Sequence, residues 1–273
     1  DLDDTLGEYS YNKFFLSYLK TFKRLELKAI PMSADTGPIG GNLSHEFIIL
    51  AETGESKIYT DKNIFDVDHR DCTLEKKSLM NLRKKFDNFY AVTDEKFNKK
   101  EFDKLVASEN QIVTKGIEVG HIFYFSDKYS KPLNCFVDTK DGKKTSIKMG
   151  SYGIGVSRLV AAIIEAKFLN NKMKWPKSIS PFDVVIIPNF NKNNTENLKK
   201  AEKVYEELKK QNIDALLDDT DESMSSKFTK HELIGIPNQI IIGSKSTSDK
   251  FEYKNDKDVS SIISLEEIKS KLI

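Results

Sequence analysis

The strongest constraint on the fold is a change of pattern at "KWPKSISPF", Lys174 to Phe182, which carries two prolines and two serines. Before this segment, short apolar stretches are separated by turns such as "DTGPIGGN", a pattern typical of hairpins. After it, continuous apolar stretches such as "DVVIIPN" and "NQIIIGS" alternate with helical patterns, as in a small α/β domain with a partly parallel sheet. We therefore expect two domains, residues 1–176 and 181–273, joined by a linker.

Composition limits the classes of protein that remain. The 273 residues suffice for two domains, and 38% hydrophobic content is typical of a folded globular protein. Because 43 Lys and Arg residues nearly balance 42 Asp and Glu residues, the whole chain has no net field that attracts nucleic acid or membrane. Two distant cysteines, Cys72 and Cys135, favour a reducing compartment. We find neither an apolar stretch of about 18 residues nor a signal peptide, which predicts a soluble protein without membrane contact.

The helices of the first domain follow from periodicity. Apolar residues recur at three and four positions from Tyr11 to Leu25, which predicts an amphipathic helix. We expect residues 56–111 to form a small helical insertion, the segment around Lys140–Gly142 to turn a hairpin, and residues 154–169 to form another helix. The opening "DLDDTLGEYSYNKFF" resembles the interior of a protein, so we also expect a truncated start.

Two predicted strands carry polar residues among apolar ones. In "SHEFIILA", alternation places Ser44 and Glu46 on one face and His45 on the other. Because both faces are otherwise apolar, His45 or Glu46 must lie in a covered environment. The alternatives are a polar group at the end of a strand and a carboxylate in a pocket.

The strand "GIEVGHIFYFS" repeats this arrangement. Simple alternation places Glu118 and Gly120 on one face and His121 on the other. A single histidine on an apolar strand is more often a core residue than a ligand, but its recurrence in two strands weakens that interpretation. Gly120 removes a side chain from the carboxylate face, as a small ligand would require, although a β-bulge explains a glycine there equally well.

A glycine-rich turn precedes an apolar helix with one arginine in "MGSYGIGVSRLVAAIIEA". Gly150, Gly153 and Gly155 match neither the dinucleotide-binding fingerprint nor a P-loop. They end a strand and let the backbone approach a ligand at a helix N-terminus, where anions are favoured. Arg158 adds donors suited to phosphate oxygens. The turn indicates an anion site; the alternative is an arginine that extends to solvent.

This segment resembles motif three of class II aminoacyl-tRNA synthetases. With "ADTGPIGGNLSHEFIILAETGES" and "KGIEVGHIFYFSDKYS" it is similar to bacterial-type prolyl-tRNA synthetase of the short subtype. The segments "SPFDVVIIPN", "LLDD" and "HELIGIPNQIIIG" resemble that family's anticodon-binding domain. The resemblance implies an α/β fold: the C-terminal part of an α+β catalytic domain with an antiparallel six-stranded sheet, then a small mixed-sheet α/β anticodon-binding domain.

The resemblance also implies a reaction and a site. The reaction is ATP-dependent activation of L-proline, helped by Mg²⁺, and transfer of prolyl to tRNA(Pro) by a cytoplasmic enzyme that is a homodimer at full length. Such catalysis depends on positioning and charge neutralisation, without a side-chain nucleophile. Arg158 would be the catalytic residue on the ATP phosphates, with Gly153 and Gly155 against the nucleotide and no metal-binding side chain. The proline and adenylate pocket would be bordered by Glu46, His45, Glu118, His121, Gly120 and Ser151, where many relatives have cysteine at the last position.

Contact with the anticodon of tRNA(Pro) is expected from Lys227, Lys230 and Glu232. Phosphate contacts would weaken as the salt concentration rises, and base recognition would target the unstacked anticodon loop. Thr220 in "DDTDES" replaces an arginine that is usual in relatives, which removes a positive charge.

Two larger departures from the family concern activity. Residues 56–111 are too short for the large editing domain of many relatives, so we expect no hydrolysis of mischarged alanyl-tRNA. Motifs one and two belong upstream of Asp1, so we expect the 273-residue chain alone to lack adenylation activity. The alternatives are a class II synthetase for threonine, histidine or glycine, and a non-catalytic synthetase-like RNA-binding accessory protein.

Overall fold

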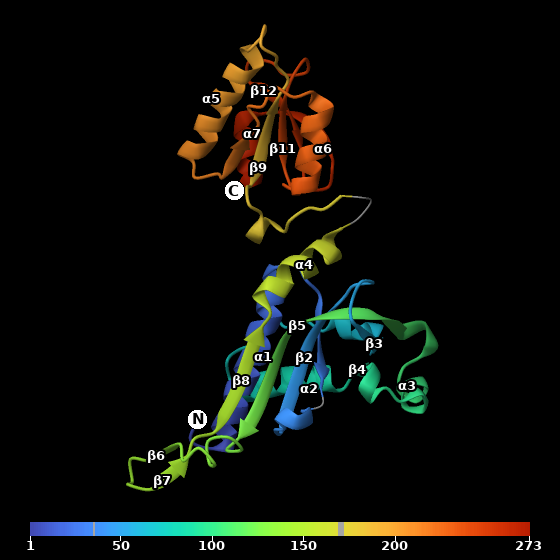
Figure 1. The fold of residues 1–273 in the computed structure, drawn as a ribbon, viewed down its shortest axis with the longest axis vertical. Helices are drawn as coiled ribbons and strands as arrows, with labels where there is room; N and C mark the ends of the chain where they lie inside the picture. The colour runs from blue at the N-terminus through green and yellow to red at the C-terminus, as the bar shows by residue number, and fades with distance from the viewer. Residues whose placement is uncertain (35, 169–171) are drawn as a thin grey trace. The chain divides into compact units, whose positions relative to one another are not determined.

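Six strands from the first 154 residues form an antiparallel sheet in the computed structural model (Figure 1). The structure describes residues 1–34, 36–168 and 172–273, and their contacts divide the chain into two units, Asp1–Ala166 and Lys167–Ile273. The sheet lies in the first unit with the order β1-β2-β5-β3-β4, and β8 pairs with β5. Its strands are β1 (Ala29–Ser33), β2 (Leu43–Leu50), β3 (Ser56–Asp61), β4 (Ala91–Thr93), β5 (Gln111–Ser126) and β8 (Met149–Ile154).

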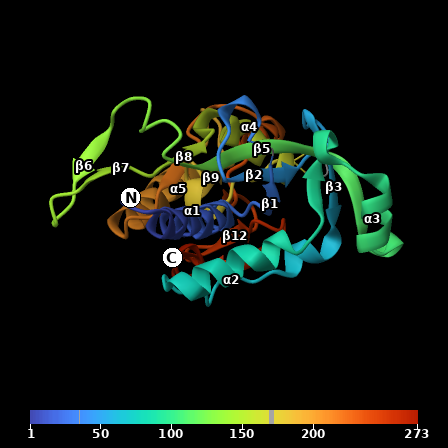
Figure 2. The same ribbon diagram turned by 90° about the horizontal axis from the view of Figure 1, so that it is seen from below.

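Helix α1 (Asp4–Arg24) covers one face of this sheet (Figures 1 and 2). The predicted apolar stripe of the helix packs on the sheet, where the Phe47 ring lies 5.2 Å from the Tyr18 ring and 5.7 Å from the Phe22 ring between centroids. Full burial of such a ring contributes roughly 1.5–3 kcal/mol. The other elements are α2 (Lys76–Asp87), α3 (Lys99–Leu105), α4 (Val156–Lys167), and a projecting hairpin of β6 (Phe136–Asp138) and β7 (Lys144–Ser146).

Strand β5 changes its neighbour halfway along one edge. Residues 111–116 pair with β3, whereas residues 120–126 pair with β8, and β2 occupies the opposite edge. A β-bulge lies at the changeover, because Phe47 faces Gly120 while the next residue, Ile48, faces Glu118. Within the described residues, positions 117–119 of β5 have no strand neighbour on this edge, and we call this stretch the β5 gap.

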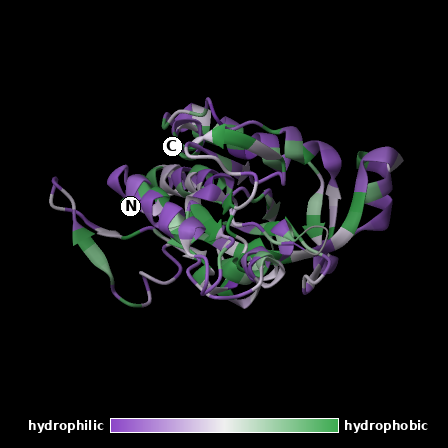
Figure 3. Cartoon of the chain, turned by 90° about the horizontal axis from the view of Figure 1, so that it is seen from above, coloured by the Kyte–Doolittle hydropathy of each residue, from purple (hydrophilic) through white to green (hydrophobic). Residues whose placement is uncertain are grey.

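The longer apolar stretches of the second unit form a five-stranded mixed sheet with the order β10-β9-β11-β12-β13. The first three strands are parallel, and β12 and β13 are antiparallel additions. Apolar residues of the strands pack against α5 and α7, and Figure 3 shows hydrophobic colour mainly along the strands and hydrophilic colour along much of the helices. The elements are β9 (Val184–Pro188), α5 (Glu196–Lys210), β10 (Ala215–Leu217), α6 (Met224–Ile234), β11 (Gln239–Ile242), β12 (Lys250–Lys254), β13 (Ser260–Ser264) and α7 (Leu265–Leu272).

The structure confirms the antiparallel first sheet, the mixed second sheet and the hairpin around Lys140–Gly142. Residues 56–111 are not a small helical insertion, because β3 and β4 within them belong to the central sheet. These strands have only six and three residues, so their alternation is too short to read among charged neighbours. Helix α1 starts at Asp4 rather than Tyr11. Helix α4 follows the expected 154–169 to Lys167, and position 169 lies outside the described residues.

The start of the predicted linker segment is part of the second unit. The Trp175 amide donates to the Gly235 carbonyl at 3.0 Å, and its indole donates to the Ile234 carbonyl at 2.9 Å. The first unit therefore ends at Ala166, ahead of the expected domain end at 176. In the described ranges, no helix is both long and apolar enough to cross a membrane.

Candidate active site

The face of the first sheet that points away from α1 carries polar residues from β2, β5 and β8. Cross-strand partners share a face, so Glu46 lies beside its partner His121, and Ser44 lies beside Phe123. Ser151 of β8 is also a partner of Phe123 and lies on this face. We use the name open-face cluster for Ser44, Glu46, Glu118, His121 and Arg158.

His121 is central because both of its ring nitrogens have partners. Its Nε2 lies 2.7 Å from Ser44 Oγ, and its Nδ1 lies 3.2 Å from Glu118 Oε1 and 3.9 Å from Glu46 Oε1. When Nδ1–H donates to the Glu118 carboxylate, Nε2 accepts from the Ser44 hydroxyl. The ring also stacks on Phe123 with 3.8 Å between centroids. These contacts fix the orientation of the imidazole.

The expectation that Glu118 and His121 lie on opposite faces is wrong. Simple alternation fails because the bulge adds one residue to β5 between them, which brings both side chains to the face opposite α1. Glu118, Glu46 and His121 therefore meet on one face of the sheet.

The expected role of Gly120 is also wrong. A Cβ at this position would lie 3.1 Å from Tyr18 Cε2 and 3.3 Å from Phe22 Cζ, so the glycine faces α1. It permits close packing of the aromatic stripe and clears no space for a ligand beside Glu118. The β-bulge alternative agrees with the structure, because the register shift lies next to this residue.

Arg158 and Gly155 donate hydrogen bonds to the backbone of the β5 gap. The Arg158 guanidinium donates to the Glu118 carbonyl at 3.0 Å, and the Gly155 amide donates to the Val119 carbonyl at 3.1 Å. These bonds satisfy backbone acceptors that a strand neighbour would otherwise bind. The guanidinium remains 48% exposed and lies 3.8 Å from Glu118 Oε2 and 3.9 Å from Glu55 Oε1, so its ion pairs are loose. It therefore keeps donors for an anion.

The two carboxyl groups beside His121 differ in proton affinity. Burial raises the pKa of Glu46, and the neighbouring Glu118 carboxylate raises it further against the opposing effect of His121. The hydrogen bond from His121 lowers the pKa of Glu118 against the effect of burial, with a further contribution from Arg158. Glu118 is thus a fixed carboxylate, while the ionised form of Glu46 is costly until a cation binds beside it.

The glycine-rich turn leaves room for a ligand at one of its two candidate positions. Gly153 is the cross-strand partner of His121, and a Cβ placed on it would meet nothing within 4 Å. At Gly155 a Cβ would lie 3.2 Å from the Cβ of Arg158, so this glycine permits the turn into α4. Ser151 is exposed on the same face.

His45 lies on the opposite face from the open-face cluster. It is 3% exposed, and its ring bonds to Tyr11 of α1 and Asp87 of α2. The structure therefore does not bring His45 to the pocket that was predicted for it. The expectation of a covered environment for His45 or Glu46 is met by His45.

In the second unit, Lys227 is fully buried and so cannot reach an anticodon. Its ammonium donates to the carbonyls of Pro188 at 3.1 Å and Asp218 at 3.2 Å, and it lies 4.5 Å from the Phe190 ring centroid. Burial lowers the pKa of this amine. We use the name internal cluster for Asp218, Lys227, Lys230 and His231.

The other two anticodon candidates are partly exposed and paired. Lys230 Nζ lies 3.2 Å from Asp218 Oδ2 and 3.3 Å from Glu222 Oε2, and it donates to the Thr220 hydroxyl. Glu232 pairs with Lys172 at 2.8 Å. Thr220 donates to Asp218 through its hydroxyl, so the residue in place of arginine binds within the same network.

Sequence reasoning missed Ser44 and Glu55 as members of the site. Alternation places Ser44 on the same face as Glu46, but Ser44 is not among the predicted site residues. Glu55 is in the turn between β2 and β3, and no periodicity indicates that it approaches Arg158.

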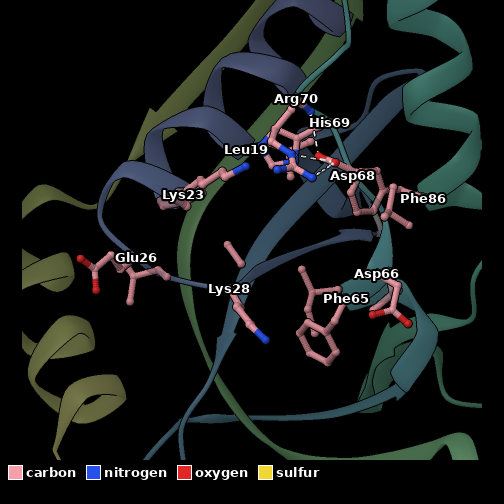
Figure 4. Close-up of a pocket in the computed structure, with 16 residues that line it drawn as sticks. Leu19, Lys23, Glu26, Lys28, Phe65, Asp66, Asp68, His69, Arg70 and Phe86 are labelled. Atoms are coloured by element: carbon pink, nitrogen blue, oxygen red, sulfur yellow. Dashed lines mark hydrogen bonds and ion pairs between the residues drawn. The ribbon is translucent and has the colours of Figure 1, made fainter. Parts of the chain in front are cut away.

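A separate cavity of about 480 Å³ lies on the α1 side of the first unit (Figure 4). Its lining is largely apolar, with Lys23 and Lys28 among the charged residues. At one end Asp68 accepts hydrogen bonds from both the amide and the side chain of Arg70 next to His69, which leaves the carboxylate occupied. His69 Nε2 is buried with no partner among the described residues, so it is not accessible to a ligand. The cavity lies away from the open-face cluster.

Comparison with known proteins first identifies the class of the second unit. A family described as "Anticodon binding domain" matches residues 183–273. This match agrees with the mixed sheet of β9 to β13, and the unit is an anticodon-binding domain of the class II synthetase type.

The whole chain is similar to proline–tRNA ligases. It is 60% identical to the protein of Pelagibacter ubique over 256 residues, which are 93% of this chain and 58% of that protein. The protein of Bartonella quintana is 51% identical over 90% of this chain and 56% of its own length, and that of Rhizobium meliloti is 48% identical over 90% and 56%. Over most of its length, the chain is a homologue of proline–tRNA ligases, and it spans a little more than half the length of these relatives.

Proposed function

We propose that this chain carries the second part of the active site and the anticodon-binding domain of a cytoplasmic proline–tRNA ligase. The observation that supports this most is the open-face cluster, in which a fixed histidine lies between Ser44 and Glu118 beside an exposed arginine. The relatives that match over 90–93% of the chain are proline–tRNA ligases, which favours proline over other amino acids.

The charges of the cluster suit the two substrates. Glu118 and Glu46 present negative charge that binds the ammonium group of proline, and His121 fixes Glu118 by its hydrogen bond. Arg158 and the open space over Gly153 accommodate the phosphates of ATP. A carboxylate oxygen of proline then attacks the α-phosphorus, the bond to the bridging oxygen breaks, and pyrophosphate leaves with the electron pair. Arg158 neutralises the charge that develops on the phosphates.

No side chain is assigned to Mg²⁺. Within the described ranges, no group of three or more His, Cys, Asp and Glu side chains is placed to hold a metal ion. Mg²⁺ would supply charge neutralisation at the ATP phosphates when bound with the nucleotide.

For the second unit we propose binding of the anticodon of tRNA(Pro). Lys230 and Glu232 remain candidates because each side chain is about a third exposed. Lys227 acts from the interior by joining the ends of β9 and β10 to α6. We also propose that the complete protein is a homodimer and that it lacks editing of alanyl-tRNA.

The experiment that tests this function is ATP–pyrophosphate exchange with the protein expressed from its own initiator codon. Proline, threonine, histidine and glycine are supplied in parallel, and we expect exchange with proline only. Exchange with another amino acid would overturn the choice of substrate. A folded protein without exchange for any of the four would favour a non-catalytic RNA-binding protein.

A further inference from the structure

A series of three polar side chains, two of them buried and the third, Asp87, 36% exposed, lies directly behind the open-face cluster. The hydroxyl of Tyr11 lies 2.5 Å from His45 Nδ1, and His45 Nε2 lies 2.8 Å from Asp87 Oδ1. Tyr11 belongs to α1 and Asp87 is the last residue of α2, so His45 joins strand β2 to both helices. The Phe15 ring packs edge-on against the imidazole at 5.1 Å between centroids. We call these residues the Tyr11–His45–Asp87 series.

The apolar residues of β2 do not decide by themselves which face of the strand meets α1. Ile48 is 0% exposed and Ile49 is 2% exposed, although they point to opposite faces. A slip of one residue would move every side chain of β2 to the other face. Apolar residues on both faces give little preference between the two orientations. The β-bulge in β5 lies beside this part of β2, where two residues of β5 already face one of β2.

His45 determines which face of β2 packs against α1. It stands between Ser44 and Glu46 in the sequence, so its face determines theirs. Any slip that took His45 out of its position would leave the Tyr11 hydroxyl and the Asp87 carboxylate without this partner, and Tyr11 is fully buried. Buried polar groups without partners are costly.

We propose that His45 is a positioning residue that holds Ser44 and Glu46 against His121 through its bonds to Tyr11 and Asp87. For proline binding this rests on the proposed function, whereas the effect on His121 is independent of any activity. His45 itself touches no substrate, because it lies on the α1 face.

The test compares three variants with one matched control. His45→Phe keeps a ring of similar size without hydrogen bonds, Tyr11→Phe removes a single oxygen, and His45→Gln keeps an amide that can bond. The control is Tyr59→Phe, which removes a comparable buried hydroxyl from the same sheet, where Tyr59 donates to Asp94 at 2.8 Å. Thermal unfolding of each variant reports stability alone.

The first readout is the ¹⁵N spectrum of the His121 imidazole, which reports its bonds to Ser44 and Glu118. We expect the ¹⁵N signals of His121 to shift in His45→Phe and Tyr11→Phe, to return toward the native positions in His45→Gln, and to remain unchanged in Tyr59→Phe. Native His121 signals in a folded Tyr11→Phe or His45→Phe protein would overturn the proposal.

The second readout is proline-dependent exchange. We expect the KM for proline to rise at least tenfold in His45→Phe, with a smaller change in kcat, and to stay within twofold of the native value in Tyr59→Phe. An equal rise in the KM for proline in His45→Phe and Tyr59→Phe would show that His45 contributes only to general stability. If the native protein shows no exchange, the proposed function fails, and the His121 spectrum still decides the role of His45.

Discussion

Each unit of the chain holds a cluster of charged side chains, and the two clusters differ in burial and in pairing. In the internal cluster, Asp218 is 4% exposed and accepts bonds from His231 at 2.6 Å and Lys230 at 3.2 Å, besides Thr220. In the open-face cluster, Arg158 is 48% exposed and lies 3.8–3.9 Å from its carboxylate neighbours. Buried charges that are closely paired hold a fold, whereas exposed charges that are loosely paired can bind a ligand.

The largest expected effect follows from removing Asp218, which accepts the hydrogen bonds of the internal cluster. Asp218→Ala leaves Lys227 and His231 buried without their carboxylate, and we expect the free energy of unfolding of the second unit to fall by about 3–5 kcal/mol. Urea unfolding monitored by circular dichroism measures this. Asp219→Ala, at the exposed neighbouring position, is the control and should have almost no effect. Equal loss in both variants would contradict the role of Asp218.

The corresponding change in the open-face cluster is Arg158→Ala. Because the guanidinium is half exposed, we expect a loss of stability of only about 0.5–1.5 kcal/mol from its hydrogen bond to the Glu118 carbonyl. The kcat/KM for ATP should fall by about 100-fold or more as charge neutralisation is lost. Proline-dependent pyrophosphate exchange measures this. Arg70→Ala removes another exposed arginine of the same unit, 73% exposed, and should leave exchange unchanged. A stable Arg158→Ala protein with native kinetics would remove Arg158 from the site.

A smaller effect is expected from Glu46→Gln. The raised pKa of Glu46 means that its ionised form opposes folding at neutral pH, so the neutral amide should leave stability unchanged or slightly increased. The KM for proline should nevertheless rise by roughly tenfold because a charge-assisted contact is lost. Glu52→Gln at an exposed turn is the control. A destabilised Glu46→Gln protein would show that the carboxylate serves the fold.

The smallest expected effect is the decrease in the stability of the second unit as the pH falls. Burial alone would raise the pKa of Asp218, but bonds from Thr220, His231 and Lys230 hold it well below its usual value. The folded unit thus binds fewer protons than the unfolded chain below about pH 4, so the stability that Asp218 contributes is complete above about pH 4 and is lost as the pH falls through its folded value.

Burial also lowers the pKa of His231, so its protonation in acid likewise favours the unfolded chain. Chemical unfolding between pH 3 and 7 should therefore show stability that falls with acid, by up to about 1.4 kcal/mol per pH unit for each proton. Asp218→Asn should flatten this slope below about pH 4. An unchanged slope there would assign the acid sensitivity to other carboxylates.

Sequence patterns predicted the helices, the strands and the residue types of the site well. They failed where a strand departs from regular alternation. Alternation along β2 correctly separated His45 from Glu46, because that strand is regular. The same reasoning separated Glu118 from His121 wrongly, because an extra residue in β5 is invisible to a period of two. The burial of Lys227 could not be predicted either, because lysines in short helices usually face solvent.

The β5 gap has a further consequence for how this unit can change in evolution. Strand β3, which carries β4 on its other edge, pairs with β5 before the gap, whereas β8 and the bonds of the open-face cluster attach at or after it, at positions 118–126. A longer loop or an added domain between β2 and the start of β5 would therefore enlarge one half of the sheet without altering the register of the other. The bulge thus separates two parts of the sheet. The part around β3 tolerates insertion, whereas one residue added in the part around β8 would turn the side chains of the site to the other face.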